Sequence, residues 1–432
     1  MAARSLPQRP TATWLQEGYK HIWMPYTQMQ TAPLPQAAVA TEGAHIILAD
    51  GTQLIDGVSS WWSACHGYNH PHIIDAIVAQ AQHMPHVMLA GLANEPAFTL
   101  AGRLAKLAPG TLNRVFFSES GSISVEIAMK MAAQYWLNKG VTGHQRFLCF
   151  KDAYHGDSLA TMSVGDPEDG IHGRFNGLMP GQHHIALPRD EASTERFEAY
   201  VAEHADTIAA VLLEPLVQGA GGMVFHNTET LATVRRVCDD HGLLLILDEI
   251  MTGLGRLGTM FACEQAGIVP DIMTLSKSLT GGTLPLAATI ANDRVFEAFL
   301  DEDLDKALMH GPTFTGNALA CAAANASLDL FETEPRLEQV RTIETHLRSA
   351  LEPCRGVNGT WGNVVDVRVR GAIGVVELDD IRDMNGLRAR FLNAGCWVRP
   401  FGKIVYLMPA FTIPEDDLGV LSDTVVKVIG ET

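Results

Sequence analysis

A lysine and an aspartate each follow an apolar stretch that predicts a strand. Residues 243–247 are all apolar and lead into Asp248, and a second apolar stretch, 272–275, leads into Ser276 and Lys277. Because ligands of open α/β sheets bind at the carboxyl ends of the strands, both side chains could face one crevice. A lysine buried there becomes nucleophilic, and the pair suits a pyridine cofactor that carries an aldehyde. The spacing alone equally allows a surface lysine and an aspartate that caps a helix.

A run of small residues could bind a phosphate group. Residues 118–122 read Ser-Glu-Ser-Gly-Ser; they follow the apolar stretch 114–117 and precede a helix predicted over 125–138. Backbone N–H groups at a helix N-terminus carry partial positive charge and favour phosphate. An ordinary helix cap has the same composition. The phosphate-binding interpretation is favoured because the run lies upstream of the aspartate and the lysine and follows the same type of strand end.

A glycine pattern further along the chain suggests a different cofactor. Residues 253–258 match GxGxxG, the pattern that binds dinucleotides when it directly follows a strand and opens a helix. Here residues 248–252 separate the strand from the first glycine, and the glycines continue into a loop. We therefore predict that this stretch does not bind a nicotinamide cofactor.

Short apolar runs alternate with helical patterns over the middle of the chain, which is typical of a mostly parallel sheet covered on both faces, the α/β class. The predicted strands are 114–117, 147–150, 209–213, 243–247, 272–275 and 286–290, and the predicted helices are 73–83, 96–107 and 125–138.

The pattern changes near residue 335. A predicted helix over 337–351 is followed by strand-like stretches at 364–369, 374–377, 396–400 and 403–408, which indicates an α+β unit. At the other end, a proline-punctuated arm precedes a strand-like stretch at 44–48. We predict three parts: an N-terminal segment of a small domain at 1–58, a large domain at 59–335, and the remainder of the small domain at 336–432.

Composition limits the partners. The chain has 432 residues, 47% of them apolar and 19% charged, with a net charge of −18. This balance fits a globular enzyme, and it argues against a nucleic-acid partner because phosphate backbones require clustered lysine and arginine. No carboxylate or cysteine completes a recognisable ligand spacing with His66, His70, His72, His183 or His184, so we predict no metal.

Cysteine usage and hydropathy bear on location. The seven cysteines are dispersed and form no CxxC pair, which indicates free thiols in a reducing compartment. The first 14 residues contain no apolar stretch suited to a signal peptide. No window reaches the roughly 18 apolar residues of a membrane span. We expect a cytoplasmic protein that does not cross a membrane.

Longer motifs resemble one enzyme family. LLLILDEIMTGLGRLG, followed by PDIMTLSKSLTGGTLPLAA, is similar to the signature of class III, fold-type I aminotransferases, which use pyridoxal 5′-phosphate (PLP). The similarity extends from His21 to about Pro414. It implies a large domain with a seven-stranded, mostly parallel sheet and a small α+β domain built from both termini. DGVSSWWSACHGYNHP and WVRPFGKIVYLMP resemble, more narrowly, members that aminate 8-amino-7-oxononanoate with S-adenosylmethionine in biotin biosynthesis.

The resemblance implies a set of cofactor-binding residues. Lys277 would form an imine with PLP, and Asp248 would pair with the pyridine nitrogen. Gly121 and Ser122 would bind the phosphate. Tyr154 would stack on the pyridine ring and also touch substrate.

The same resemblance implies a substrate pocket. Tyr26, Trp61 and Trp62 would line it, with Gly311 alongside and Tyr154 and Lys277 at its base, and Arg399 would bind the substrate carboxylate. Tyr26 is expected to act in catalysis together with Lys277 and Asp248. An aromatic slot suits a substrate with a methylene chain, and a guanidinium binds a carboxylate in bidentate fashion. Core packing for the tryptophans and a surface ion pair for the arginine are the alternatives.

Further positions implied by the resemblance concern a second subunit and the amino donor. Pro312 and Thr313 would reach the phosphate of a neighbouring subunit, so a homodimer with shared active sites is expected. Glu214 and Arg256 occupy positions that the wider family uses for handling the amino donor, and their roles in this chain stay open.

Three other functions remain as alternatives. Another class III aminotransferase would use an ω-amino acid or a diamine as donor. A racemase or aminomutase would turn over without a keto-acid acceptor. A PLP-sensing regulator would need a DNA-binding module, and the first 58 residues contain no basic recognition helix.

Overall fold

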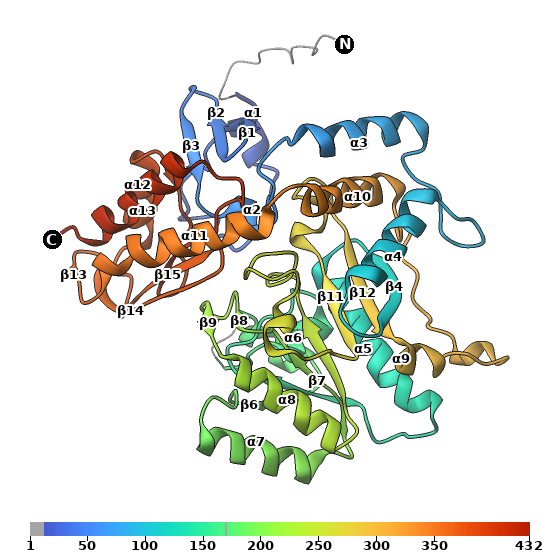
Figure 1. The fold of residues 1–432 in the computed structure, drawn as a ribbon. Helices are drawn as coiled ribbons and strands as arrows, with labels where there is room; N and C mark the ends of the chain where they lie inside the picture. The colour runs from blue at the N-terminus through green and yellow to red at the C-terminus, as the bar shows by residue number, and fades with distance from the viewer. Residues whose placement is uncertain (1–12, 169–170) are drawn as a thin grey trace.

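A computed structural model describes residues 13–168 and 171–432, and a seven-stranded sheet lies at its centre (Figure 1). The strand order is β4-β12-β11-β10-β7-β5-β6, and only β12 runs antiparallel to its neighbours. The strands are β4 (Leu112–Ser118), β5 (Arg146–Phe150), β6 (His183–Ile185), β7 (Ile208–Leu213), β10 (Leu244–Asp248), β11 (Ile272–Leu275) and β12 (Ala287–Asn292). The mostly parallel sheet expected from the sequence is confirmed.

Helices cover both faces of this sheet because its central strands are apolar on both sides. Leu244 and Ile246 of β10 belong to the apolar cluster around α5 (Gly121–Asn138). The alternate residues, Leu245 and Leu247, belong to a second cluster that contains residues of α4 (Glu95–Leu107) and α8 (Thr228–Asp240). This alternation follows from the two-residue period of a strand.

Other helices complete the large layer. Helix α10 (Ala318–Thr333) packs against both α3 (Pro71–His83) and α4. Helices α6 (Leu159–Val164), α7 (Glu191–His204) and α9 (Asp293–Glu297) also belong to this region. Figure 1 shows α7 and α8 side by side at one edge, away from α3 and α10.

The two ends of the chain share a second sheet. Its order is β1-β2-β3-β16, in which the C-terminal β16 (Cys396–Trp397) pairs in parallel with the N-terminal β3 (Gln53–Asp56). In Figure 1 the blue strands therefore lie beside the orange and red helices. The other strands of this sheet are β1 (Ala38–Glu42) and β2 (His45–Leu48). The helices of the C-terminal part are α11 (Arg336–Ala350), α12 (Met384–Asn393) and α13 (Glu415–Ile429).

A third sheet, β13-β14-β15-β17, is built from the C-terminal part alone. Its longer strands are β14 (Gly362–Arg370), β15 (Ile373–Leu378) and β17 (Ile404–Leu407). A small unit assembled from both termini thus stands beside the α/β layer, as the resemblance implies. The domain limits at 58 and 335 stay predictions, and residues 1–12 of the predicted first segment lie outside the described residues.

The described ranges contain neither a candidate membrane helix nor a candidate metal site. None of the helices there combines the length and apolar character that crossing a lipid bilayer requires. Within the same ranges, no group of three or more histidine, cysteine, aspartate or glutamate side chains is placed to share a metal ion. The absence of a metal stays a prediction.

Candidate active site

A cavity of about 160 Å³ lies where the carboxyl ends of β10 and β11 meet the start of α5. It brings together six residues that the sequence analysis assigns to the site: Trp62, Gly121, Ser122, Tyr154, Asp248 and Lys277. These come from distant parts of the chain. The crevice expected from two neighbouring strand ends is therefore present, because β10 and β11 pair in parallel.

Asp248 ends β10 and is buried beside a histidine. Its Oδ2 lies 2.8 Å from Nδ1 of His155, and its Oδ1 accepts the N–H of Ile250 at 3.1 Å. A carboxylate can only accept, so Nδ1 is the donor. Nε2 of the same ring is buried and has no hydrogen-bond partner among the described residues. His155 was not predicted, since nothing in the spacing along the chain shows that it contacts Asp248.

Lys277 follows β11 and is turned toward the cavity by an unusual backbone. Its φ is 34°, in the left-handed region, and its Nζ lies 4.9 Å from the ring centroid of Trp62. Burial lowers the pKa of the amine, while Asp248 and Glu214 oppose that shift. A lowered pKa favours the neutral form of the amine, which an imine bond to an aldehyde requires.

The start of α5 also lines the cavity, through Gly121 and Ser122. Helix α5 begins at Gly121, one residue before Ser122, whose Oγ accepts the N–H of Asp157 at 3.1 Å. Gly156 has a φ of 133°, and a Cβ there would overlap Ser122. The 154–157 loop therefore packs closely on the helix N-terminus, next to Lys277. This arrangement fits a phosphate group, which helix N-termini favour.

Glu214 is a buried carboxylate that binds the backbone of Tyr154. It is 5% exposed, and its two oxygens accept the N–H groups of Gly219 at 2.8 Å and Tyr154 at 3.1 Å. Burial raises its pKa to about 7. Glu214 thus lines the cavity while it fixes the loop that carries Tyr154. Its role toward an amino donor stays a prediction.

Tyr26 and Tyr154 meet at one carboxylate. Both hydroxyls donate to Oδ1 of Asp157, and the bond from Tyr154 is 2.9 Å long. The hydroxyl oxygens of Tyr26 and Tyr154 lie 3.4 Å apart. Burial, with the Asp157 contact, raises the pKa of Tyr26 to about 12. Nε2 of His172 lies 2.9 Å from the same oxygen, and its ring stacks on Tyr154. The two tyrosines were expected from the family resemblance, whereas Asp157 and His172 were not predicted.

The paired tryptophans lie on a left-handed turn. Ser59, Ser60, Trp61 and Trp62 have φ values of 45°, 49°, 60° and 74°. Each such residue other than glycine costs roughly 1–2 kcal/mol. Trp62 is buried against Tyr406, to whose hydroxyl it donates at 3.1 Å. Trp61 is 49% exposed, with its ring against that of Tyr26. Core packing accounts for Trp62 in part but does not account for Trp61.

Arg399 follows β16, and its guanidinium lies 5.6 Å from the ring of Trp397. Across 13–168 and 171–432, its side chain makes no ion pair within 4.0 Å. Its charge acts on the hydroxyl of Tyr406, the group that binds Trp62. Arg399 is therefore near the tryptophan end of the site, with its guanidinium available to an acid.

Gly311, Pro312 and Thr313 do not line the cavity at Lys277. They line a separate, mostly apolar hollow of about 620 Å³, together with Met88 and Phe98. The family resemblance implies that Pro312 and Thr313 reach the phosphate of a neighbouring subunit. The placement outside their own cavity fits that expectation, which stays a prediction.

The glycine pattern at 253–258 forms turns and opens no helix. Its Arg256 is fully buried, donates to the carbonyl oxygen of Pro409 at 2.7 Å and lies over the ring of Phe411. The pattern therefore lacks the strand–helix geometry of a dinucleotide site.

The fold and the site define a class of enzyme. The sequence profile of the Aminotransferase class-III family matches residues 26–429, and the chain belongs to this family. Class III aminotransferases use PLP. The aspartate, lysine and helix N-terminus around one cavity fit that cofactor.

Individual relatives are more specific. The adenosylmethionine-8-amino-7-oxononanoate aminotransferase of Mycobacterium leprae is 41% identical over 419 residues, 95% of each chain. The enzyme of the same name from Corynebacterium glutamicum is 40% identical, covering 91% of this chain and 93% of that one. Among solved structures, the Methanocaldococcus jannaschii enzyme of that name matches with a TM-score of 0.91 at 34% identity, over 96% and 98% of the two chains. A PLP-bound amine transaminase from an uncultivated Pseudomonas species matches at 0.87 and 32%, over 95% and 98%.

Proposed function

We propose that this protein transfers an amino group from S-adenosylmethionine to 8-amino-7-oxononanoate, giving 7,8-diaminononanoate in biotin biosynthesis. The observation that carries the proposal is the cavity in which Lys277, Asp248 and Trp62 meet, near Arg399, which makes no ion pair with any described residue. The named relatives, at about 40% identity over nearly the whole chain, support this choice of substrates.

PLP would supply an aldehyde and a ring that accepts electrons from the substrate carbon. Lys277 would hold the aldehyde through Nζ. Asp248, oriented by His155, would keep a proton on the pyridine nitrogen. Gly121 and Ser122 would bind the phosphate at the start of α5, and the ring of Tyr154 would pack against the cofactor plane.

Lys277 would carry out the proton transfer. Burial lowers the pKa of its amine, which favours the neutral form that can accept a proton. With PLP and substrate bound, Nζ would accept the proton from the substrate Cα and would later donate it, acting first as a base and then as an acid. Tyr26, hydrogen-bonded beside Tyr154, would orient the substrate over this position.

The substrate would lie along the tryptophans. A methylene chain packed on Trp61 and Trp62 gains about 0.8 kcal/mol per buried CH₂. Arg399 would bind the terminal carboxylate of the acceptor with two parallel hydrogen bonds.

A homodimer would complete the site. Gly311, Pro312 and Thr313 line a hollow of their own, from which they would reach the partner's phosphate and substrate. We place the reaction in the cytoplasm, because all seven cysteines are free.

The deciding experiment is an assay of the purified holoenzyme with both substrates. We expect 7,8-diaminononanoate, with parallel lines in double-reciprocal plots because both substrates use one site in turn. Amination with an ω-amino acid or a diamine as donor, but not with S-adenosylmethionine, would favour another class III aminotransferase. Turnover without a keto acceptor would favour a racemase or aminomutase.

Replacement of the lysine tests the site itself. Lys277→Ala should remove both the activity and the visible absorption band of the cofactor–lysine imine, because no other amine lines the cavity in the described part of the chain. The exposed Lys106 of α4 provides a control, and Lys106→Ala should retain both. Persistence of the band in Lys277→Ala would reject the lysine assignment.

A further inference from the structure

The left-handed turn that carries the tryptophans is held by one buried carboxylate, Asp56. Its Oδ1 accepts the N–H of Val58 at 2.8 Å. Its Oδ2 accepts the N–H of Ser60 at 2.8 Å and the hydroxyl of Tyr68 at 2.5 Å. Asp56 is only 2% exposed. Both oxygens of the carboxylate are thus committed to the turn and to one tyrosine.

The same residue joins the turn to the segment that carries Arg399. Asp56 ends β3, where it pairs with Trp397 of β16. The next residue, Gly57, donates its N–H to the carbonyl oxygen of Trp397 at 3.0 Å. Arg399 follows two residues later along the chain. Asp56 therefore lies where the tryptophan turn and the arginine segment meet.

An outside group is needed to hold this turn. Four successive residues other than glycine do not adopt left-handed φ values by their own preference. Burial raises the pKa of Asp56, while the bonds from Tyr68 and the backbone lower it. A carboxylate presents only acceptors to these donors, whereas an amide would turn an NH₂ group toward at least one of them.

We propose that Asp56, together with Tyr68, is a positioning residue for substrate recognition: it fixes Trp61 and Trp62 relative to Arg399 without touching substrate. The inference rests on the proposed function. Trp62 packs against Lys277, so the position of the turn also bears on the reacting amine. Ser59, whose Oγ donates to the carbonyl oxygen of Met408 at 2.9 Å, anchors the turn from its other side.

The test compares holoenzymes of the wild type, Asp56→Asn and Tyr68→Phe. We expect Asp56→Asn to lower kcat/KM for the amino acceptor by about 100-fold, as a misplaced binding group does. KM should rise more than kcat falls, and the near-ultraviolet circular dichroism of the tryptophans should change. Tyr68→Phe leaves both backbone bonds to Asp56 in place, so it should change the same quantities in the same direction by less.

Asp50 provides a control at an exposed aspartate in the turn between β2 and β3. Its carboxylate accepts the N–H of Thr52 at 2.9 Å in the turn before β3, away from the tryptophans. Asp50→Asn should leave kcat/KM and the tryptophan signal unchanged. The proposal is overturned if Asp56→Asn lowers only the melting temperature and matches Asp50→Asn in kcat/KM. If Asp56→Asn does not fold, unchanged kinetics and an unchanged tryptophan signal in Tyr68→Phe overturn it instead.

Failure of the proposed function gives a different result. In that case the wild type itself does not aminate 8-amino-7-oxononanoate. The variants are then compared in the donor half-reaction, followed as loss of the visible band of the bound cofactor with any donor that converts the wild type. A variant that reacts with this donor like the wild type overturns the positioning role.

Discussion

At the scale of single residues, the hydrogen bond between His155 and Asp248 is a contact of the site in which both side chains are almost fully buried. The imidazole side chain is fully buried, and the carboxylate that it binds is 5% exposed. Hydrogen bonds to charged groups contribute about 1.5–3 kcal/mol, and a buried acceptor that loses its donor suffers the full desolvation penalty. The pair therefore controls how firmly Asp248 faces the cavity.

We predict that His155→Ala lowers kcat of the holoenzyme by about 10- to 100-fold, the equivalent of one such hydrogen bond. Asp248 would keep only weaker donors and would hold the pyridine proton less firmly. Steady-state kinetics at saturating PLP would measure the loss. Unchanged kcat, with a change in PLP affinity alone, would place His155 in cofactor binding only.

Glu249, next to Asp248, gives a pH-dependent stability. It is 1% exposed, and burial raises its pKa from 4.5 to about 7. Between these values the unfolded carboxyl has released its proton while the folded one retains it. The folded state then binds more protons, so the free energy of unfolding falls as the pH rises, by up to about 1.4 kcal/mol per pH unit. Below pH 4.5 this contribution is fully present.

Glu249→Gln should flatten this part of the pH profile because glutamine does not titrate. Denaturant unfolding of wild type and variant at several pH values between 5 and 7 would measure the two slopes. Equal slopes would show that Glu249 ionises normally in the fold.

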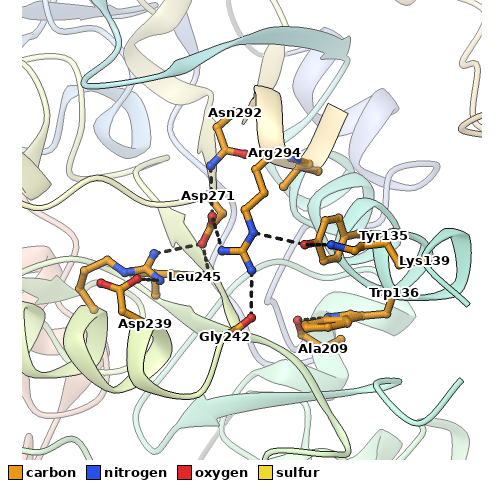
Figure 2. A network of polar contacts seen from close by, with 12 residues as sticks. Tyr135, Trp136, Lys139, Ala209, Asp239, Gly242, Leu245, Asp271, Asn292 and Arg294 are labelled. Carbon is orange, nitrogen blue, oxygen red and sulfur yellow. Dashed lines mark hydrogen bonds and ion pairs between the residues drawn. The ribbon is translucent and has the colours of Figure 1, made fainter. Parts of the chain in front are cut away.

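At the scale of elements, the end of the sheet opposite the cavity is tied together by Asp271 (Figure 2). The carboxylate precedes β11 and accepts from Arg235 of α8 and Asn292 of β12, at 3.0 and 3.1 Å, and from the N–H of Leu245 in β10 at 2.9 Å. Arg294 adds an ion pair at 3.5 Å. Four elements therefore depend on one buried side chain.

We predict that Asp271→Ala destabilises the fold by about 3–5 kcal/mol, as expected when one partner of a buried pair is removed. The exposed pair of Asp293 with Arg114 is the control, and Asp293→Ala should cost at most about 1 kcal/mol. Denaturant unfolding measures both values. Folded Asp271→Ala should keep its kcat, since the network lies at the far end of the strands.

Sequence patterns predicted elements where one physical signal dominates. The runs at 243–247 and 272–275 are apolar because both faces of β10 and β11 are covered, and both strands form as expected. Strand β6 was not predicted, since its His-His-Ile stretch is short and polar. The left-handed turn at Ser59–Trp62 was missed because it contains no glycine, the usual signal of a positive φ.

Contacts between distant segments were the least predictable part of the site. Lys277 and Asp248 could be paired because neighbouring strand ends meet at one edge. Asp56, Asp157 and His172 act through tertiary contacts that no spacing along the chain reveals. The tyrosines, the tryptophans and Arg399 were assigned to the site from the family resemblance, and their roles stay predictions.

At the scale of the whole molecule, apolar side chains around the second hollow stay exposed in the single chain. Phe98 is 61% exposed, Met88 58% and Phe314 53%. A second copy that covers this surface would also bring Pro312 and Thr313 to the partner's site.

We predict a dimer by sedimentation, and we predict that Phe98→Asp dissociates it, because a charge would be buried without a partner. The monomer should bind PLP weakly and lose activity. Val365→Asp, at an exposed apolar residue of β14, should leave both mass and activity unchanged. An active monomeric variant would show that each chain's site is complete by itself.

The burial of all seven cysteines offers a practical route to labelling. Burial raises the pKa of every one of these thiols above its ordinary value. Buried thiols with high pKa values react slowly with maleimides. A single cysteine engineered on the surface would therefore accept a fluorophore selectively in the native enzyme. Distances between the large and small units could then be followed during turnover without first deleting a native cysteine.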